Sequence, residues 1–345
     1  MTNAMPEPNV STYAPLRYLC RKSLQALPTL DGRLDKPFWD AAEWSEDFVD
    51  IEGEAKPLPA KRTRFKMLWD DDCVYFGAEL IEDEIWATLT ERDSVIFHDN
   101  DFEIFIDPDG DTHQYYEFEM NALNTVWDLL LVKPYRDGGP CVNGWDIQEI
   151  RSAVHIEGRL NDPSADNRFW SIEAAMPWKA LKECAPNGRP PLPGEFWRVN
   201  FSRVQWQVEV KDNKYVKKID PRTGRPYPED NWVWSPQGII NMHYPELWGY
   251  VFFADEAVGE TPSIPEDERR KWELRRLYYR QRQFYSEHER YSSELADLQL
   301  TEWTEEPRIE VTSRTFLASV PGSDGKSRIY IQEEGKVWKE LAKDE

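Results

Sequence analysis

Hydrophobic and polar residues alternate along much of the chain up to about Ala254, and a period of two residues indicates β-strands. Turns rich in Asp, Asn, Gly and Pro separate the alternating runs, as turn chemistry requires. Ten short strands with few helices predict a mainly β chain folded as an antiparallel β-sandwich. The expected strands are Thr63–Asp70, Val74–Glu82, Asp101–Asp107, Tyr115–Asn121, Val126–Lys133, Ser152–Glu157, Phe169–Met176, Phe196–Trp206, Trp232–Trp234 and Trp248–Phe253.

The clearest alternation runs from Asp99 to Leu131 and predicts a hairpin followed by a third strand. Successive side chains of a strand point to opposite faces, so the hairpin gains one apolar face and one rich in carboxylate, amide and ring groups. Carboxylates grouped with aromatic rings suit a sugar-binding surface. The apolar face is expected to hold Phe102, Ile104, Ile106, Tyr116, Phe118 and Met120, and the polar face Glu103, Phe105, Asp107, Tyr115, Glu117, Glu119 and Asn121.

The pattern changes after Ala254. The segment Asp255–Pro265 indicates a linker, and helical spacing then predicts a long helix from Glu266 to about Tyr291, with Ser263 and Glu266 as a capping box. We therefore expect an N-terminal arm over 1–29, a β-sandwich over 30–254, and a linker, long helix and small α+β domain over 255–345. The other expected elements are a short helix at Pro177–Cys184 and two or three strands among Arg308–Thr312, Thr315–Ser319 and Ser327–Ile331.

Composition narrows the possible partners. The chain has 345 residues, 40% of them hydrophobic, and a formal charge of −22, so it can bury a sizeable core but repels nucleic acid and anionic membranes. No apolar run approaches the roughly 20 residues of a transmembrane helix, so we expect no membrane insertion. No signal peptide is visible. The cellular location stays open: secreted or periplasmic if a signal was removed, otherwise cytoplasmic.

The chain has four cysteines, and none of them forms a CxxC motif with another: Cys20, Cys73, Cys141 and Cys184. A disulfide between them cannot be assigned.

Six motifs follow one another along the chain: Leu30–Trp39 (LDGRLDKPFW), Arg64–Phe76, Asp101–Asp107 (DFEIFID), Trp170–Trp178, Phe196–Ser202 and Trp248–Gly249. Together, in this order, they resemble a family 9 carbohydrate-binding module, in the wider DOMON-like group. The resemblance covers about 30–254 and implies a β-sandwich that binds sugars without catalysis on its concave face, in bacterial carbohydrate catabolism. Such modules also bind structural calcium, so a structural Ca²⁺ is a possible cofactor.

The resemblance also assigns site residues. The sheet glutamate of the family matches Glu103, and its late-strand asparagine matches Asn200. Its two sugar-clamping tryptophans fall on Phe97 and near Met242 or His243, and an arginine of its second hairpin strand falls on Glu119. These replacements point to an altered ligand preference.

The leading hypothesis is therefore a mono- or oligosaccharide-binding protein. Phe97 and Trp206 would stack on the sugar ring, as Trp234 could, and polar side chains would bind the hydroxyls. The candidate ligand-binding residues are Phe97, Glu103, Glu117, Glu119, Asn121, Asn200, Arg203, Trp206, Trp234, Asn241 and His243.

Two alternatives stay open. Paired carboxylates also suit an enzyme that hydrolyses glycosides, and relatives in the DOMON-like group can hold haem, for which Met120, Met242 or His243 would be the axial ligands. The Asp107–Asp111 loop (DPDGD) lacks the Gly and Glu positions of an EF-hand, so a hairpin turn is the favoured interpretation.

Overall fold

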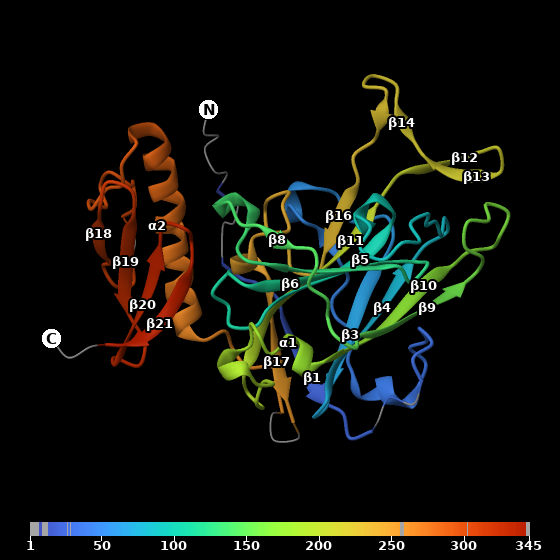
Figure 1. Ribbon diagram of the computed structural model, residues 1–345, viewed down its shortest axis with the longest axis horizontal. Helices are drawn as coiled ribbons and strands as arrows, with labels where there is room; N and C mark the ends of the chain where they lie inside the picture. The colour runs from blue at the N-terminus through green and yellow to red at the C-terminus, as the bar shows by residue number, and fades with distance from the viewer. Residues whose placement is uncertain are drawn as a thin grey trace.

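A computed structural model describes residues 7–8, 13–25, 27, 29–255, 259–301 and 303–342 (Figure 1). Thirteen strands form one sheet that curls into a sandwich-like body, so the predicted mainly β sandwich is confirmed. The strands of this sheet are β1 (Arg17–Lys22), β2 (Val49–Asp50), β3 (Thr63–Trp69), β4 (Cys73–Ile81), β5 (Asp101–Asp107), β6 (Tyr115–Asn121), β7 (Val126–Leu131), β8 (Cys141–Val142), β9 (Arg151–Glu157), β10 (Phe169–Pro177), β11 (Phe196–Gln205), β16 (Asp230–Val233) and β17 (Gly249–Ala254).

The long strand β11 is where the sheet divides. Along one side it pairs with β5; along the other, Phe196–Val199 pair with β17 and Ser202–Gln205 pair with β16. The layer of β5 and β6 thereby crosses over the layer of β3, β4 and β10 (Figure 1). The main core fills the space between the layers, where the rings of Phe65 and Phe201 stack at 3.8 Å.

Glu173 on β10 explains the motif that opens the sandwich. Its carboxylate is fully buried and accepts hydrogen bonds from the backbone of Asp31 (2.9 Å) and Gly32 (3.0 Å) and from the Trp39 indole (2.8 Å). Gly32 has φ +81°, and a Cβ there would lie 2.2 Å from the His155 backbone. The Asp-Gly turn and the tryptophan are thus docked onto one buried acid.

The beginning of the chain differs from the prediction of a loose arm. Residues 17–22 form β1, which lies between β17 and β3 and is parallel to both. Only Tyr18 and Cys20 of this strand are core residues, so its hydrophobic signal is short. The helix expected at Pro177–Cys184 is confined to α1 (Trp178–Leu181). Six other short strands were not predicted: β2, β8, β12 (Val208–Lys211), β13 (Lys214–Lys217), β14 (Ile219–Asp220) and β15 (Arg225–Pro226).

The C-terminal part places one long helix against a four-stranded sheet, at one end of the long axis of the molecule (Figure 1). The helix begins after Pro265, which makes no side-chain cap, so the expected capping box of Ser263 and Glu266 does not form. Residues 256–258 of the expected linker lie outside the described residues. The elements are α2 (Glu266–His288), β18 (Arg308–Val311), β19 (Phe316–Pro321), β20 (Ser327–Gln332) and β21 (Val337–Leu341), the last of which was not predicted.

A second core joins this part to the sandwich. Leu274, Leu277 and Tyr278 of α2 pack with Ile329 of β20 and with Leu247, which precedes β17. Within the described residues, no helix is long and apolar enough to cross a membrane. All four cysteines are free thiols.

Candidate functional site

Strand register brings the predicted acids together on the side of β5 and β6 that faces away from the main core. Glu103 lies directly opposite Glu119, and Phe105 lies opposite Glu117. Asp101 occupies the same side of β5 as Glu103, two residues earlier. We call Asp101, Glu103, Glu117 and Glu119 the acidic face.

The acidic face is buried. Glu119 is 1% exposed, Glu103 4% and Asp101 0%. Burial disfavours the charged form and raises the pKa of Glu103 to about 7 and that of Glu117 to about 8. Burial, together with the neighbouring acids, also raises the pKa of Asp101 and of Glu119. Protons, a cation or a polar ligand must therefore compensate these groups.

Few protein groups satisfy these carboxylates. Glu119 accepts a hydrogen bond from the Phe97 backbone N–H (3.0 Å), and Asp101 Oδ1 accepts one from the Val204 N–H (3.3 Å). Asp101 Oδ2 has no partner among the described residues. In the same part of the chain, none of the four acids makes an ion pair with Lys, Arg or His.

Aromatic rings lie beside the acidic face. Phe97, which precedes β5, is half-buried, and its ring centroid lies 6.4 Å from that of Trp127 on β7. Trp127 is directly opposite Glu119 in the β6–β7 pairing. Tyr135 is 46% exposed; burial is the main cause of its raised pKa, and the charges of Glu117 and Glu119 add to it. The phenol therefore lies within electrostatic reach of both acids.

His243 adds a ring to the same side. Its centroid lies 4.5 Å from that of Tyr135, and its Nδ1 is 2.8 Å from the Tyr115 hydroxyl. Burial, with a smaller effect of Arg136, lowers the pKa of His243 to about 3, so the imidazole is neutral at pH 7. The exposed Asn241 accepts the His243 backbone N–H at 2.9 Å and so shapes this loop.

Three other predicted site residues are occupied by structural contacts. Both oxygen and nitrogen of the Asn121 amide are bonded to the chain, including Leu89 O at 2.9 Å. Asn200 donates to Ser235 O at 2.9 Å and accepts the Ser235 N–H at 3.0 Å. Trp206 donates to Phe97 O at 2.8 Å, while Lys217 Nζ lies 3.2 Å from its ring centroid. Trp206 thus positions the Phe97 loop, and the lysine covers its ring.

The two remaining predicted residues lie away from the acidic face. Arg203 is buried and forms an ion pair of 2.8 Å with Glu82 at the end of β4. Trp234 is fully buried in the main core, where its ring meets that of Phe65 at 5.1 Å. Of the candidate haem ligands, Met120 also belongs to the main core, whereas Met242, next to His243, belongs to a smaller hydrophobic cluster that includes Phe105.

Sequence reasoning missed Asp101, Trp127, Tyr135 and Ser202 at this site. Asp101 and Ser202 follow the same alternation as Glu103 and Asn200, so extending the register by one step along each strand would have found them. Trp127 required the pairing of the third strand with Glu119. Tyr135 lies in the loop after β7, and no sequence period fixes a loop residue.

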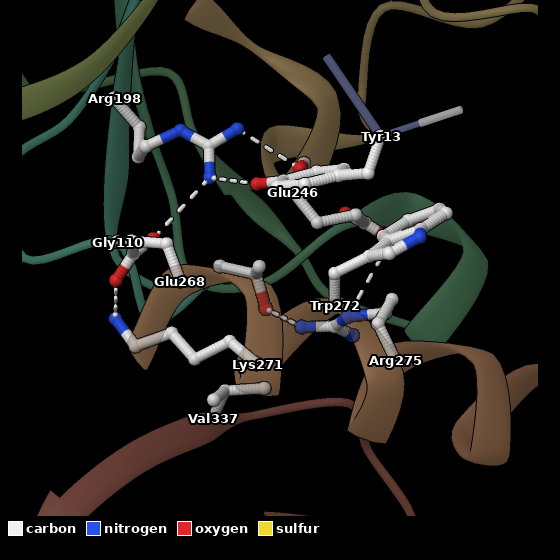
Figure 2. A pocket seen from close by; sticks show the side chains of 10 residues that line it. Tyr13, Gly110, Arg198, Glu246, Glu268, Lys271, Trp272, Arg275 and Val337 are labelled. Atoms are coloured by element: carbon white, nitrogen blue, oxygen red, sulfur yellow. Dashed lines mark hydrogen bonds and ion pairs between the residues drawn. The ribbon is translucent and has the colours of Figure 1, made fainter. Parts of the chain in front are cut away.

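A second polar cluster lies where α2 meets the sandwich (Figure 2). Glu268 lies 2.8 Å from Lys271 and 3.6 Å from Arg198, and Arg275 donates to Thr112 at 3.1 Å. The cavity between them has a volume of about 20 Å³, enough for about one water molecule. The paired charges and small volume make this cluster a structural junction.

Comparisons with known proteins agree with the β-sandwich fold of residues 30–189. Residues 30–189, which include β5, β6 and β7, match the family described as carbohydrate family 9 binding domain-like. No curated protein matches the chain.

Solved structures resemble the chain at low identity. A proposed carbohydrate-binding protein from Bacteroides uniformis is 14% identical, with a TM-score of 0.50 over 70% of this chain and 100% of that one. A family 9 carbohydrate-binding module from Caldicellulosiruptor kristjanssonii, in complex with cellotriose, is 17% identical, with a TM-score of 0.43 over 72% of this chain and 100% of that one. By sequence, residues 30–189 are the part of the chain that resembles the carbohydrate family 9 binding domain-like family.

Proposed function

We propose that the chain binds carbohydrate without transforming it, and that the binding site is the acidic face with the rings beside it. The observation that carries this proposal is the position of Glu103, Glu117 and Glu119 next to Phe97 and Trp127, inside the segment that matches the carbohydrate-binding family. Carboxylates accept hydroxyl protons, and aromatic rings pack against the apolar faces of sugar rings.

The exposed fraction of each side chain decides which part of a sugar it can contact. Phe97, Trp127 and Tyr135 are accessible enough to touch a sugar ring, whereas Glu103 and Glu117, at 4% and 6% exposure, can each offer an oxygen to a hydroxyl at its edge. His243 is neutral and hydrogen-bonded to Tyr115, so it serves as a ring contact.

A glycan array tests the proposal. The wild-type protein is expected to bind a set of related glycans on the array. Glu117→Gln is expected to bind the same glycans at least about 10-fold more weakly, the equivalent of 1.4 kcal/mol. Asp109→Asn, in the Asp107–Asp111 loop outside the acidic face, is the matched control and should bind like wild type. Equal binding by Glu117→Gln, or binding lost only in Asp109→Asn, would exclude this site.

A further inference from the structure

We propose that the four-stranded C-terminal sheet docks a second copy of this chain on the face that turns away from α2. The sheet lies at one end of the long axis of the molecule (Figure 1), and its inward side chains, such as Ile329, enter the second core with α2. Successive side chains of a strand point to opposite faces, so the alternate residues form what we call the outer face. Its rings and charged groups are Arg308, Glu310, Arg328, Tyr330, Trp338 and Glu340.

Two large aromatic rings are partly exposed on the outer face. Trp338 is directly opposite Tyr330 in the β20–β21 pairing, and their ring centroids lie 5.4 Å apart with 16° between the ring planes. Both side chains are half-buried, as is Leu317 of β19 on the same face, whereas the inward Ile329 is fully buried. The stacked pair stabilises the hairpin, but it also leaves apolar surface in water. Tryptophan and tyrosine are the residues that most often anchor protein interfaces.

The charges of the outer face balance. Arg328 is directly opposite Glu340 in the strand register, and Arg308 forms an ion pair of 3.1 Å with Glu310. Two arginines and two glutamates contribute no net charge, so the formal charge of −22 lies on the rest of the chain. Two copies of so acidic a chain repel each other through most of their surface. On the outer face they can meet without bringing an excess of like charges together.

This balance favours a second copy over a partner of one charge sign. A two-fold dimer brings identical surfaces together, so each surface must complement itself. A face that carries both signs does so when the arginines of one copy meet the glutamates of the other. A strongly acidic or basic ligand would meet as many repelling as attracting groups here.

The size of the outer face sets the expected strength of the dimer. Its strands are four to six residues long. Four strands about 4.8 Å apart, with a rise of about 3.3 Å per residue, give a face of roughly 15 by 18 Å. That is less than the roughly 800 Å² that each partner buries in a standard interface. We therefore expect a weak dimer that dissociates on dilution. The acidic face takes no part in it, so this inference is independent of the proposed sugar binding.

Sedimentation equilibrium of the full chain without sugar, over micromolar concentrations at physiological ionic strength, tests the interface. The wild type is expected to pass from monomer to dimer as its concentration rises. Trp338→Ala should dimerise at least about 10-fold more weakly, because it removes an anchoring ring. Phe97→Ala, which removes a ring beside the acidic face, is the aromatic control and should dimerise like the wild type.

Two charge reversals separate a local contact from an effect of net charge. Glu340→Arg and Glu149→Arg change the formal charge equally, but Glu149 lies on the sandwich, where it pairs with Lys179. Both changes make the chain less acidic, so general repulsion between copies falls in both. Glu340→Arg also unbalances the outer face and should weaken the dimer at least about 10-fold. Glu149→Arg should dimerise at least as well as the wild type.

A chain that stays monomeric at the highest concentration would overturn the interface. So would dimers that persist unchanged in both Trp338→Ala and Glu340→Arg, or that are weakened equally in the two controls. Retention of the wild type on cellulose that Trp338→Ala abolishes would also overturn it, because the rings would then serve a polysaccharide. Circular dichroism of each variant shows that it is folded.

Discussion

Glu103 and Glu119 face each other across two neighbouring strands, with Asp101 beside them. Like charges directly opposite in a sheet are destabilising, and burial without a partner increases the penalty. A core built only for stability would place apolar residues at these positions. Protons or a bound polar species must therefore compensate these acids.

Glu103→Gln should stabilise the protein when no ligand or metal is present. At pH 8 in EDTA, we expect the free energy of unfolding to rise by about 1 kcal/mol, because one buried charge is removed from the group. Denaturant unfolding followed by tryptophan fluorescence measures this change. A decrease would show that the Glu103 carboxylate is already compensated within the protein.

His243 should make the fold sensitive to acid. The ordinary pKa of histidine is 6.5, and burial lowers that of His243 to about 3. Between these values the unfolded chain binds more protons, so stability falls as the pH drops from 6.5 towards 3. His113, whose pKa burial also lowers to about 3, acts in the same direction. His243→Gln, which retains His113, should lose less stability over this range in denaturant titrations at successive pH values; an identical decline would contradict the assignment.

At the scale of elements, alternation was informative where a strand has one clear apolar face. It located β3 to β7 and the two faces of the β5–β6 hairpin, because every second side chain there enters the main core. It failed for β1, whose two core residues give too short a signal, and for β21, where only Val337 is buried. Trp234 was misjudged because a tryptophan in the core and one at a binding face look alike in sequence.

The junction between α2 and the sandwich depends on paired buried charges. Glu246, before β17, lies 2.9 Å from Arg136 and 3.6 Å from Arg275, and it accepts a hydrogen bond from Tyr279. Burial opposes ionisation of Glu246, but the two arginines outweigh it and lower the pKa to about 2. The carboxylate is therefore ionised at all ordinary pH values.

Glu246→Gln should be strongly destabilising, by about 3–5 kcal/mol, because it removes the carboxylate shared by the buried Arg136 and Arg275, of which Arg136 keeps Asp137 at 3.3 Å. Chemical denaturation at pH 7 measures this loss, and the exposed-pair variant Glu149→Gln, which removes the partner of Lys179, should change stability by less than about 1 kcal/mol. Similar effects of the two substitutions would contradict a structural role for the junction charges.

At the scale of the whole molecule, the C-terminal part shares a core with the sandwich. Leu247 and Tyr244, before β17, pack with α2 residues in the second core. The sequence predicted the helix and most of its strands, but the docking surface could not be predicted, because a helix pattern shows which face is buried and not what covers it. Phe97 and three acids of the acidic face were predicted, whereas Trp127 and Tyr135 were not, because they depend on the pairing of a third strand and on a loop.

Leu277→Ala tests whether the two parts unfold together. Leu277 is fully buried in the second core, so the substitution should lower stability by about 2–5 kcal/mol. Hydrogen exchange should then speed up in α2 and also in residues 244–250. Faster exchange confined to α2 and β18–β21 would indicate that the C-terminal part opens independently.

Calorimetric titration of mono- and oligosaccharides, including glucose and cellotriose, into the wild type, Phe97→Ala and Trp338→Ala tests the central claim most directly. Trp338, stacked on Tyr330 in the C-terminal sheet at 5.4 Å, provides an aromatic control outside the acidic face. We predict that at least one sugar binds the wild type and Trp338→Ala alike, and that Phe97→Ala weakens it by about 1–3 kcal/mol through loss of ring contact. No heat with any sugar, or equal affinity in Phe97→Ala, would contradict the account.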